Sequence, residues 1–324
     1  MRVAIFGATG FVGSHLLAAL TANGHHVTAM VRPGSESKVT HNASVTRVSG
    51  DIHDSQAICQ MLELADAAIY NIGILRECPA QGISFYDLQF DAARDVMNLA
   101  CEKGVNRFLL MSANGVSAEG NSYQRSKYLA EEYLKTTALD WTIFRPSVIF
   151  GEPNGRMEFA TQLYRDIVSS PLPAPLFFNG LLPGNAGSFG LSPIHVKDVA
   201  RIFVESLSDA ETCGRSYELG GPEALTWKQI LERISDTTGD SLSTLPVPAW
   251  GIRSLALALD RFSFFPLTRD QLDMLMAGNT CDTSAVFEHF GIMPRNFDQT
   301  NLAYLRCKHQ RDPTSNAFRE LKNL

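Results

Sequence analysis

The sequence predicts an α/β protein in which helices cover both faces of a doubly wound parallel sheet, with a small C-terminal lobe. Three observations support this prediction. Short β-rich runs alternate with helical patterns up to about residue 150, as in chains whose parallel strands are joined by crossover helices. The runs lack polar alternation, which is expected of strands buried on both faces. After Gly151 a stretch rich in Pro, Gly and Asn interrupts the alternation.

The predicted elements follow one another at spacings typical of such a fold. Strands are predicted at residues 3–6, 26–31, 44–48, 67–70, 107–111 and 141–144, and helices at 11–22, 84–103 and 123–136. Residues 171–190 are predicted to form a long loop. A strand at 191–195, a helix at 196–207, a strand at 216–219 and a helix at 226–237 complete the order. Thr226 and Gln229 fit a capping box at the start of the last helix.

Composition argues against several classes of function. Of the 324 residues, 45% are hydrophobic and 19% are charged, which is typical of a soluble globular protein. The net charge of −6 argues against nucleic acid as a partner, because phosphate binding requires a basic surface. The six cysteines are scattered and form no CxxC pair, so we expect free thiols in a reducing compartment and no metal site.

The N-terminus and the hydropathy pattern predict a soluble, cytoplasmic protein. The first six residues already read as a core strand, which leaves no room for a targeting peptide. No stretch of the sequence approaches the ~20 apolar residues of a membrane-spanning helix. Peripheral association with a membrane stays open, although we interpret the aromatic cluster of Trp250, Phe262, Phe264 and Phe265 as core of the lobe.

A glycine-rich turn follows the first predicted strand and opens the first predicted helix. Its sequence is Gly-Ala-Thr-Gly-Phe-Val-Gly, from Gly7 to Gly13. Glycines let the backbone turn tightly and approach a pyrophosphate, and the helix N-terminus offers free N–H groups. The spacing is GxxGxxG, whereas the standard Rossmann spacing is GxGxxG. We predict a Rossmann dinucleotide site with contacts from Gly7, Thr9, Gly10, Phe11, Val12 and Gly13.

The end of the second predicted strand favours NADP(H) as the cofactor and leaves NAD(H) as the alternative. An NAD site places Asp or Glu there to accept a hydrogen bond from the ribose 2′-hydroxyl. This strand instead ends in Val31 followed by Arg32, with Ser35, Ser37 and Lys38 close behind, and we count no carboxylate at this position. A guanidinium at Arg32 would suit a 2′-phosphate.

Tyr123 and Lys127 form a second candidate site. They are four residues apart at the start of a predicted helix, so they share one face. An ammonium near a phenol favours the phenolate, and we expect Lys127 to lower the pKa of Tyr123 and so assist proton transfer to or from a carbonyl or hydroxyl group. The alternative is that the pair binds only ribose and water.

With these motifs in place, the chain resembles the extended or atypical branch of the short-chain dehydrogenase/reductase superfamily, which includes NAD-dependent epimerases and dehydratases. The resemblance covers roughly residues 1–235 and also rests on Gly50-Asp-Ile52, Asn71-Ile-Gly73 and Arg145-Pro-Ser-Val-Ile-Phe-Gly151. Within the branch, the segment from Ser122 to Glu132 and the segment from Pro193 to Ala200 look most like relatives of the nucleotide-binding accessory subunit of respiratory complex I.

The resemblance implies roles for residues at the strand ends. In the superfamily the acid after the third strand holds the adenine amine, the loops after strands four and six flank the nicotinamide, and the lysine bonds the nicotinamide ribose. Carried over, the cofactor contacts fall on Asp51, Ile52, Asn71, Gly73, Lys127, Pro146, Ser147 and Val148. We interpret His195 as a packed or capping residue and Arg145 as a backbone anchor.

One departure from the superfamily concerns the hydroxyl that orients the substrate carbonyl beside the tyrosine. The expected Ser or Thr falls near Ala113, which leaves Ser112 or Asn114 as imperfect stand-ins. We take Ser112 as the third candidate catalytic residue. The departure weakens the case for catalysis.

The predicted organisation has three parts. Residues 1–150 form a Rossmann dinucleotide-binding domain completed by about 188–232, residues 151–187 and 233–304 form a small substrate or partner lobe, and residues 305–324 form a polar tail. Two functions fit this organisation. One is an NADP(H)-dependent oxidoreductase or epimerase/dehydratase acting on an unidentified small molecule. The other is a non-catalytic NADP(H)-binding protein with a protein partner, serving in respiratory-complex assembly or quinone-linked metabolism.

Overall fold

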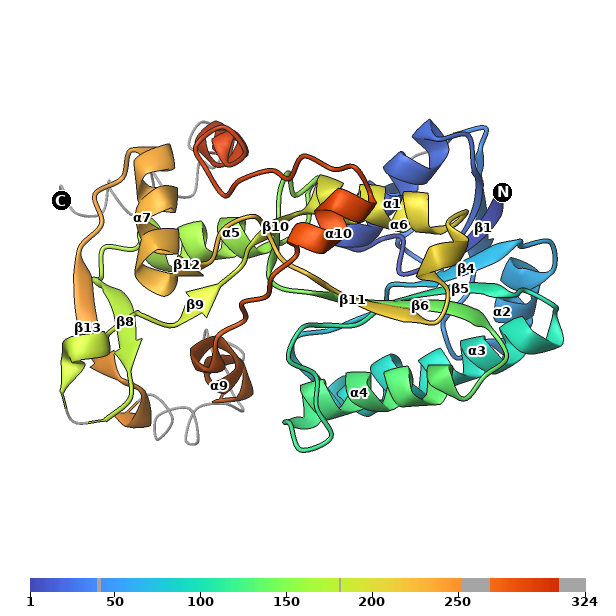
Figure 1. Ribbon diagram of the computed structural model, residues 1–324, viewed down its shortest axis with the longest axis horizontal. Coiled ribbons are helices and arrows are strands. Elements are labelled where there is room, and N and C mark those ends of the chain that lie inside the picture. The colour runs from blue at the N-terminus through green and yellow to red at the C-terminus, as the bar shows by residue number, and fades with distance from the viewer. Residues whose placement is uncertain (40–41, 181, 252–268, 309–324) are drawn as a thin grey trace.

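The computed structural model describes residues 1–39, 42–180, 182–251 and 269–308. Its centre is a seven-stranded sheet in the order β11-β6-β5-β4-β1-β2-β3, and every neighbouring pair in it is parallel. The predicted doubly wound sheet is therefore confirmed (Figure 1). The strands are β1 (Arg2–Phe6), β2 (His26–Val31), β3 (Val45–Ser49), β4 (Ala67–Tyr70), β5 (Arg107–Met111), β6 (Asp140–Pro146) and β11 (Arg215–Leu219).

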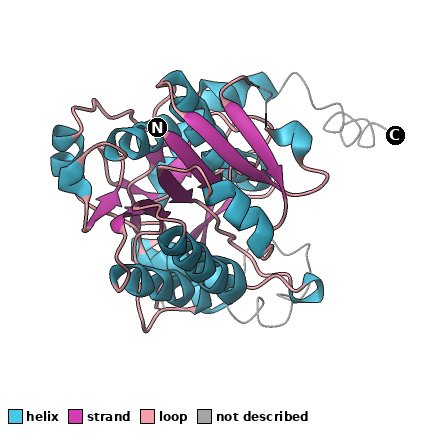
Figure 2. Cartoon of the chain, turned by 90° about the vertical axis from the view of Figure 1, so that its right-hand side faces the viewer, coloured by secondary structure: helices cyan, strands magenta, loops and turns pink. Residues whose placement is uncertain are grey.

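Helices cover both faces of the sheet (Figure 2). On one face lie α1 (Phe11–Ala22), α6 (Val196–Ser206) and α10 (Ser284–His289), and on the other lie α2 (Ser55–Leu62), α3 (Ala92–Glu102) and α4 (Ser122–Lys135). Alternate residues of β1 point to opposite faces of the sheet. Val3 and Ile5 pack in the core beneath α1, α6 and α10, and Ala4 and Phe6 pack in the core beneath α2, α3 and α4. This double burial explains why the strands show no polar alternation.

The lobe has its own apolar core. It contains α5 (Phe159–Leu163), the π-helical turn η4 (Tyr164–Val168), α7 (Trp227–Thr238) and α9 (Arg269–Ala277). Strand β8 (Ala174–Phe178) pairs in parallel with β13 (Thr244–Pro248). Two short pairs are β9 (Gly190–Leu191) with β12 (Leu225–Thr226) and β7 (Ile149–Phe150) with β10 (Ile194–His195), and Phe150, Leu191 and Leu225 join the lobe core. The predicted capping box of α7 is present, with Thr226 as its N-cap.

Four expectations from the sequence are corrected by the structure. The stretch 171–190 is not a continuous loop, because it contains β8. Helix α2 was not predicted, although its N-cap Asp54 accepts hydrogen bonds from two backbone N–H groups of the first turn. The predicted tail begins too early, because Ala303–Lys308 forms a 3-10 helix in which Leu305 is buried. The interpretation of Trp250 as lobe core is wrong as well, because its side chain is 61% exposed. Residues 309–324, and Phe262, Phe264 and Phe265 of the aromatic cluster, lie outside the described residues.

Within the described ranges, none of the helices has the length and apolar character needed to cross a membrane.

Candidate cofactor and catalytic site

The glycine turn joins β1 to α1 and owes its shape to two of its glycines. Gly7 has a φ of +95°, in the left-handed region that favours glycine, and a Cβ added there would lie 2.7 Å from the carbonyl oxygen of Asn71. A Cβ added to Gly13 would lie 2.0 Å from the carbonyl oxygen of Gly7. Both positions exclude a side chain because backbone atoms already fill the space.

Gly10 differs from its two neighbours in the motif. A Cβ added to it would meet only the carbonyl oxygen of Gly7, at the ordinary contact distance of 3.5 Å. Gly10 is the N-cap of α1, and no side chain caps this helix, so the N–H groups of its first turn stay available to a ligand. An open glycine beside an uncapped helix N-terminus fits the pyrophosphate of a dinucleotide cofactor.

Arg156, in the loop after β7, holds the glycine turn against the loop 32–39 that follows β2. Its Nε donates to the carbonyl oxygen of Thr9 at 2.9 Å, and its Nη2 donates to that of Lys38 at 2.6 Å. A third bond runs from Nη1 to the carbonyl oxygen of Asn154. Sequence reasoning missed Arg156, because only the fold brings residue 156 beside residues 9 and 38.

Most side chains of the loop 32–39 face solvent, whereas Val39 at its end is buried in the core. Arg32 is exposed, and its guanidinium has no hydrogen bond or ion pair within the described residues. The expectation of a loop without a carboxylate is wrong, because Glu36 lies in it. The Glu36 carboxylate is turned back on its own loop and accepts a hydrogen bond from the N–H of Gly34 at 3.0 Å. These local bonds also hold the pKa of Glu36 below its ordinary value.

The end of β3 places Asp51 and Ile52 beside the end of β2, since the N–H of Gly50 donates to the carbonyl oxygen of Val31. Ile52 is buried, and Asp51 is half-buried. His53 lies between two carboxylates: its Nε2 is 3.2 Å from Asp87 and 3.9 Å from Asp51. The acid that the resemblance assigns to the adenine amine therefore has a titratable neighbour.

Lys127 connects the ends of β4 and β5. Its Nζ donates to the carbonyl oxygen of Met111 at 3.1 Å, and a Cβ added to Gly73 would lie 3.5 Å from Nζ. Burial lowers the pKa of Lys127 to about 8, against the opposing effect of the Glu131 carboxylate. The absence of a side chain at Gly73 keeps the space beside this ammonium open.

Tyr123 lies one turn before Lys127, on the same face of α4, and its ring centroid is 5.9 Å from Nζ. Phe85 packs edge-on against it at 5.6 Å between ring centroids. Burial raises the pKa of Tyr123 to about 12. The expected lowering is therefore wrong, because desolvation of the phenolate outweighs the ammonium at this distance. Tyr123 is a protonated phenol near neutral pH.

Ser112 follows β5 and is hydrogen-bonded within the contact between α4 and the sheet. Its Oγ donates to Oε1 of the fully buried Glu131 at 2.5 Å. The same carboxylate binds Arg145 on β6, whose Nε donates to Oε1 at 3.0 Å. Ser112 therefore belongs to a buried Ser–Glu–Arg network that joins β5, α4 and β6.

The loop 146–148 at the end of β6 is fixed by bonds to four other segments, the first of which runs from the N–H of Asn114 to the carbonyl oxygen of Pro146. The N–H of Ser147 donates to the carbonyl oxygen of Leu219, and its Oγ donates to that of Asn279 at 2.8 Å. The carbonyl oxygen of Val148 accepts from the N–H of Ile194. The Ser147 hydroxyl thereby ties the loop to the segment that follows α9.

His195 is the N-cap of α6, and its Nδ1 accepts a hydrogen bond from the N–H of Lys197 at 3.1 Å. Burial, together with the charges of Arg295 and Lys197, lowers the pKa of His195 to about 3, so the ring is neutral. The interpretation of His195 as a capping residue agrees with this contact.

The carboxyl ends of β1 to β6 thus meet along one edge of the sheet, which we call the cofactor edge: the turn 7–13, the loop 32–39, the ends of β3 to β6 and the first turns of α4. The order of strands reverses between β1 and β4, and ligands of such sheets bind at this switch point. A dinucleotide can extend from the loop after β2, across the glycine turn, to Lys127.

Comparisons with known proteins indicate a dinucleotide-binding chain. A family model described as NAD(P)H-binding matches residues 7–166. The chain is 25% identical to the mitochondrial NADH-ubiquinone oxidoreductase 40 kDa subunit of Neurospora crassa, over 98% of this chain and 80% of that protein. It is 25% identical to the ceramide reductase of Caulobacter vibrioides, over 81% of this chain and 78% of that protein.

Among solved structures, the UDP-glucose 4-epimerase of Thermus thermophilus in complex with NAD is similar, with a TM-score of 0.71 and 18% sequence identity. The match covers 97% of this chain and 100% of the epimerase chain. The likeness extends through the lobe, so sheet and lobe together form the fold that the epimerase shares.

Proposed function

We propose that this chain, an NAD(P)H-binding protein of the extended short-chain dehydrogenase/reductase fold, is an NADP(H)-dependent oxidoreductase that reduces a carbonyl group. The observation that carries the proposal is the placement of Tyr123 and Lys127. The two side chains share one face of α4 at the cofactor edge, and Lys127 is bonded to the end of β5. A protonated Tyr123 is a proton donor, and reduction of a carbonyl is the direction that needs one.

The reduced cofactor, when bound, supplies the hydride. Tyr123 donates its phenolic proton to the carbonyl oxygen as the carbonyl carbon gains the hydride, so that C=O becomes CH–OH. The phenolate left on Tyr123 lies near the Lys127 ammonium, which stabilises the negative charge. A proton from water restores the phenol. The proton donor and its charged neighbour are thus both supplied by one helix.

A preference for NADP(H) over NAD(H) is part of the proposal. Arg32 is exposed directly after β2 and is free to bind an anion. The carboxylate of Glu36, which could have accepted from a ribose hydroxyl, is engaged with Gly34. A charge-assisted bond between guanidinium and phosphate then favours the phosphorylated cofactor.

A second candidate function is a non-catalytic NADP(H)-binding protein in a respiratory or quinone-linked complex. The hydrogen bond from Ser112 to Glu131 favours this second function, because it engages the hydroxyl that would otherwise orient a substrate carbonyl. The relative from Neurospora crassa, named as a subunit of NADH-ubiquinone oxidoreductase, also supports it. An epimerase or dehydratase would use the same Tyr123–Lys127 pair.

Substitution of Tyr123 separates the two candidates. Tyr123→Phe removes only the phenolic oxygen, so NADPH affinity is expected to persist while turnover across a panel of aldehydes, ketones and quinones falls ~10²–10⁴-fold. Tyr128→Phe, on the same helix but outside the pair, is the matched control and should keep full turnover. A wild-type protein that retains NADPH through purification and oxidises none of it across the panel would contradict the reductase and support the binding protein.

A further inference from the structure

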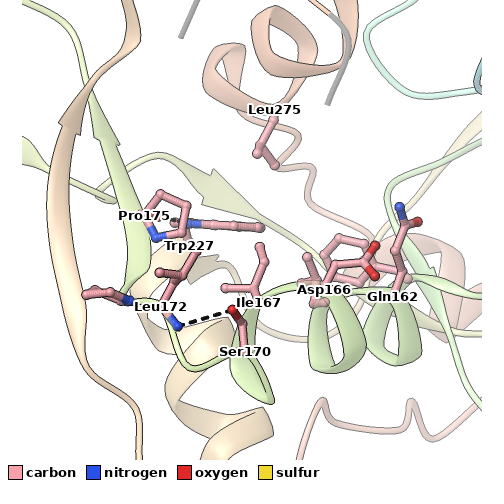
Figure 3. Close-up of a pocket in the computed structure, with 11 residues that line it drawn as sticks. Gln162, Asp166, Ile167, Ser170, Leu172, Pro175, Trp227 and Leu275 are labelled. Atoms are coloured by element: carbon pink, nitrogen blue, oxygen red, sulfur yellow. Dashed lines mark hydrogen bonds between the residues drawn. The ribbon is translucent and has the colours of Figure 1, made fainter. Parts of the chain in front are cut away.

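A pocket of about 390 Å³ lies in the lobe, apart from the glycine turn and the Tyr123–Lys127 pair. One wall is formed by α5 and η4, whose Phe159, Leu163 and Ile167 recur at the spacing of one helical face. Trp227 and Leu275 contribute to the facing walls (Figure 3). The pocket, which is partly open to solvent, is thus lined by side chains from the beginning of the lobe and from α9 near its end.

The described residues that line the pocket offer an anionic ligand no cation to pair with. None of the described lining residues is Lys, Arg or His, so a phosphate or carboxylate would find no cation to pair with. The one charged group, Asp166, is already paired with Arg165 at 2.7 Å. Ser170 is also engaged, since its Oγ accepts from the N–H of Leu172. Apart from the side-chain amide of Gln162, the surface that remains is apolar.

The pocket is connected to the part of the cofactor edge assigned to the nicotinamide. Leu275 on α9 lies four residues before Asn279, whose carbonyl oxygen accepts from the Ser147 hydroxyl. Four residues span at most about 14 Å. On the other side, α5 follows β7, which begins directly after Val148. Both walls therefore start from segments that touch the loop 146–148.

We propose that this pocket binds the uncharged hydrocarbon chain of the substrate, while the carbonyl at the chain's end lies at Tyr123. This inference rests on the reductase function proposed above and names its substrate class. A methylene group is similar in size to a water molecule, which occupies about 30 Å³. A pocket of about 390 Å³ therefore holds on the order of a dozen chain carbons. Leu172, which is 72% exposed at the pocket, extends the apolar surface outwards.

The test measures binding without turnover, using straight-chain alcohols from 1-butanol to 1-decanol and the protein loaded with NADP⁺. Burial of each added methylene should tighten binding about three- to four-fold until the pocket is full. Dissociation constants that do not change with chain length would overturn the proposal.

Two variants locate the binding. Ile167→Trp fills the pocket and should weaken 1-decanol binding by at least ~10-fold. Leu245→Trp is the matched control, because Leu245 is an exposed lobe residue that does not line the pocket. This variant should bind 1-decanol as tightly as wild type. If Ile167→Trp fails to fold, Leu172→Asp, which brings a charge to the exposed part of the lining, should weaken 1-decanol binding in the same direction. Undiminished binding by the folded pocket variant would overturn the proposal.

The same measurements distinguish this inference from the function on which it rests. If alcohol binding depends on chain length but the protein never oxidises NADPH, the reductase function is contradicted and the hydrocarbon pocket is supported. Reduction of short carbonyls with no preference for longer chains, together with undetectable alcohol binding, would leave the reductase and overturn the hydrocarbon pocket.

Discussion

The cofactor edge and the lobe are stabilised by different kinds of contact. At the cofactor edge, backbone carbonyls dominate: Lys127 donates to Met111, and Arg156 donates to Thr9 and Lys38. In the lobe, apolar side chains such as Trp227 and Phe177 pack around one core. Hydrogen bonds to backbone carbonyls fix polar groups by distance and direction, whereas apolar packing depends mainly on filled volume. Substitutions in the two regions should therefore affect different properties.

The largest effect is expected at the glycine turn. Gly13→Ala places a Cβ 2.0 Å from the carbonyl oxygen of Gly7, so the turn must rearrange and NADPH binding should be lost. Gly10→Ala meets the same atom at 3.5 Å, so the fold should persist, and only the approach of the pyrophosphate should suffer. Thermal unfolding and calorimetric titration of both variants check this contrast. Equal behaviour of the two variants would contradict the distinction between a structural glycine and a ligand-facing one.

In the lobe, the largest effect is expected at Trp227, which is 1% exposed. Trp227→Ala leaves a cavity and removes the bond from Nε1 to the carbonyl oxygen of Pro175, so the free energy of unfolding should fall by ~3–5 kcal/mol. NADPH affinity of the folded protein should stay unchanged. Trp250→Ala is the control, because Trp250 is 61% exposed. Loss of NADPH affinity in Trp227→Ala would show that the two regions are not independent.

The two regions also differ in how well the sequence predicts them. Helix α1 and strands β2, β4 and β5 begin and end where the sequence predicts, because a buried strand followed by glycines or polar residues is a local signal. Strand β8 was missed because its partner β13 lies about seventy residues later, and pairing over that distance leaves no local pattern. The strand pairing in the lobe therefore could not be predicted from the sequence.

Within the site, residue types were predictable but their partners were not. Tyr123 and Lys127 share a helical face as their spacing predicts. The direction of the Tyr123 pKa shift was wrong, because burial cannot be judged from a spacing. The Ser112 hydroxyl and Arg156 were likewise beyond prediction, since their partners lie 19 and 147 residues away in the chain.

A smaller effect is expected at the loop after β2. Arg32→Ala should weaken NADPH binding by ~1.5–3 kcal/mol, the worth of a bond to a charged group, and should leave NADH binding almost unchanged. Arg156→Ala is the informative control: it loosens the glycine turn and the loop 32–39 together, so it should weaken binding of both cofactors without changing their ratio. Titrations with both cofactors check this, and an unaltered ratio in Arg32→Ala would contradict the NADP(H) preference.

The smallest effect concerns the buried ammonium of Lys127, whose pKa falls from an ordinary 10.5 to about 8. Between these values the unfolded chain binds more protons than the folded one, so stability rises with pH. The contribution should be about 2 kcal/mol between pH 7.5 and 9.5. It is measured in the cofactor-free protein as the change in unfolding free energy of wild type relative to Lys127→Met.

Lys135→Met supplies the control for this measurement, because Lys135 is exposed in the last turn of the same helix. Its unfolding free energy should follow that of wild type across the pH range, since the exposed side chain stays hydrated in the folded protein. If Lys127→Met also follows wild type, the Lys127 ammonium is not desolvated by the fold. The cofactor edge would then hold an accessible cation for the ribose instead of a buried one tuned towards Tyr123. Parallel pH profiles for wild type and Lys127→Met would thus contradict the lowered pKa of Lys127, while the positive charge beside Tyr123 would remain.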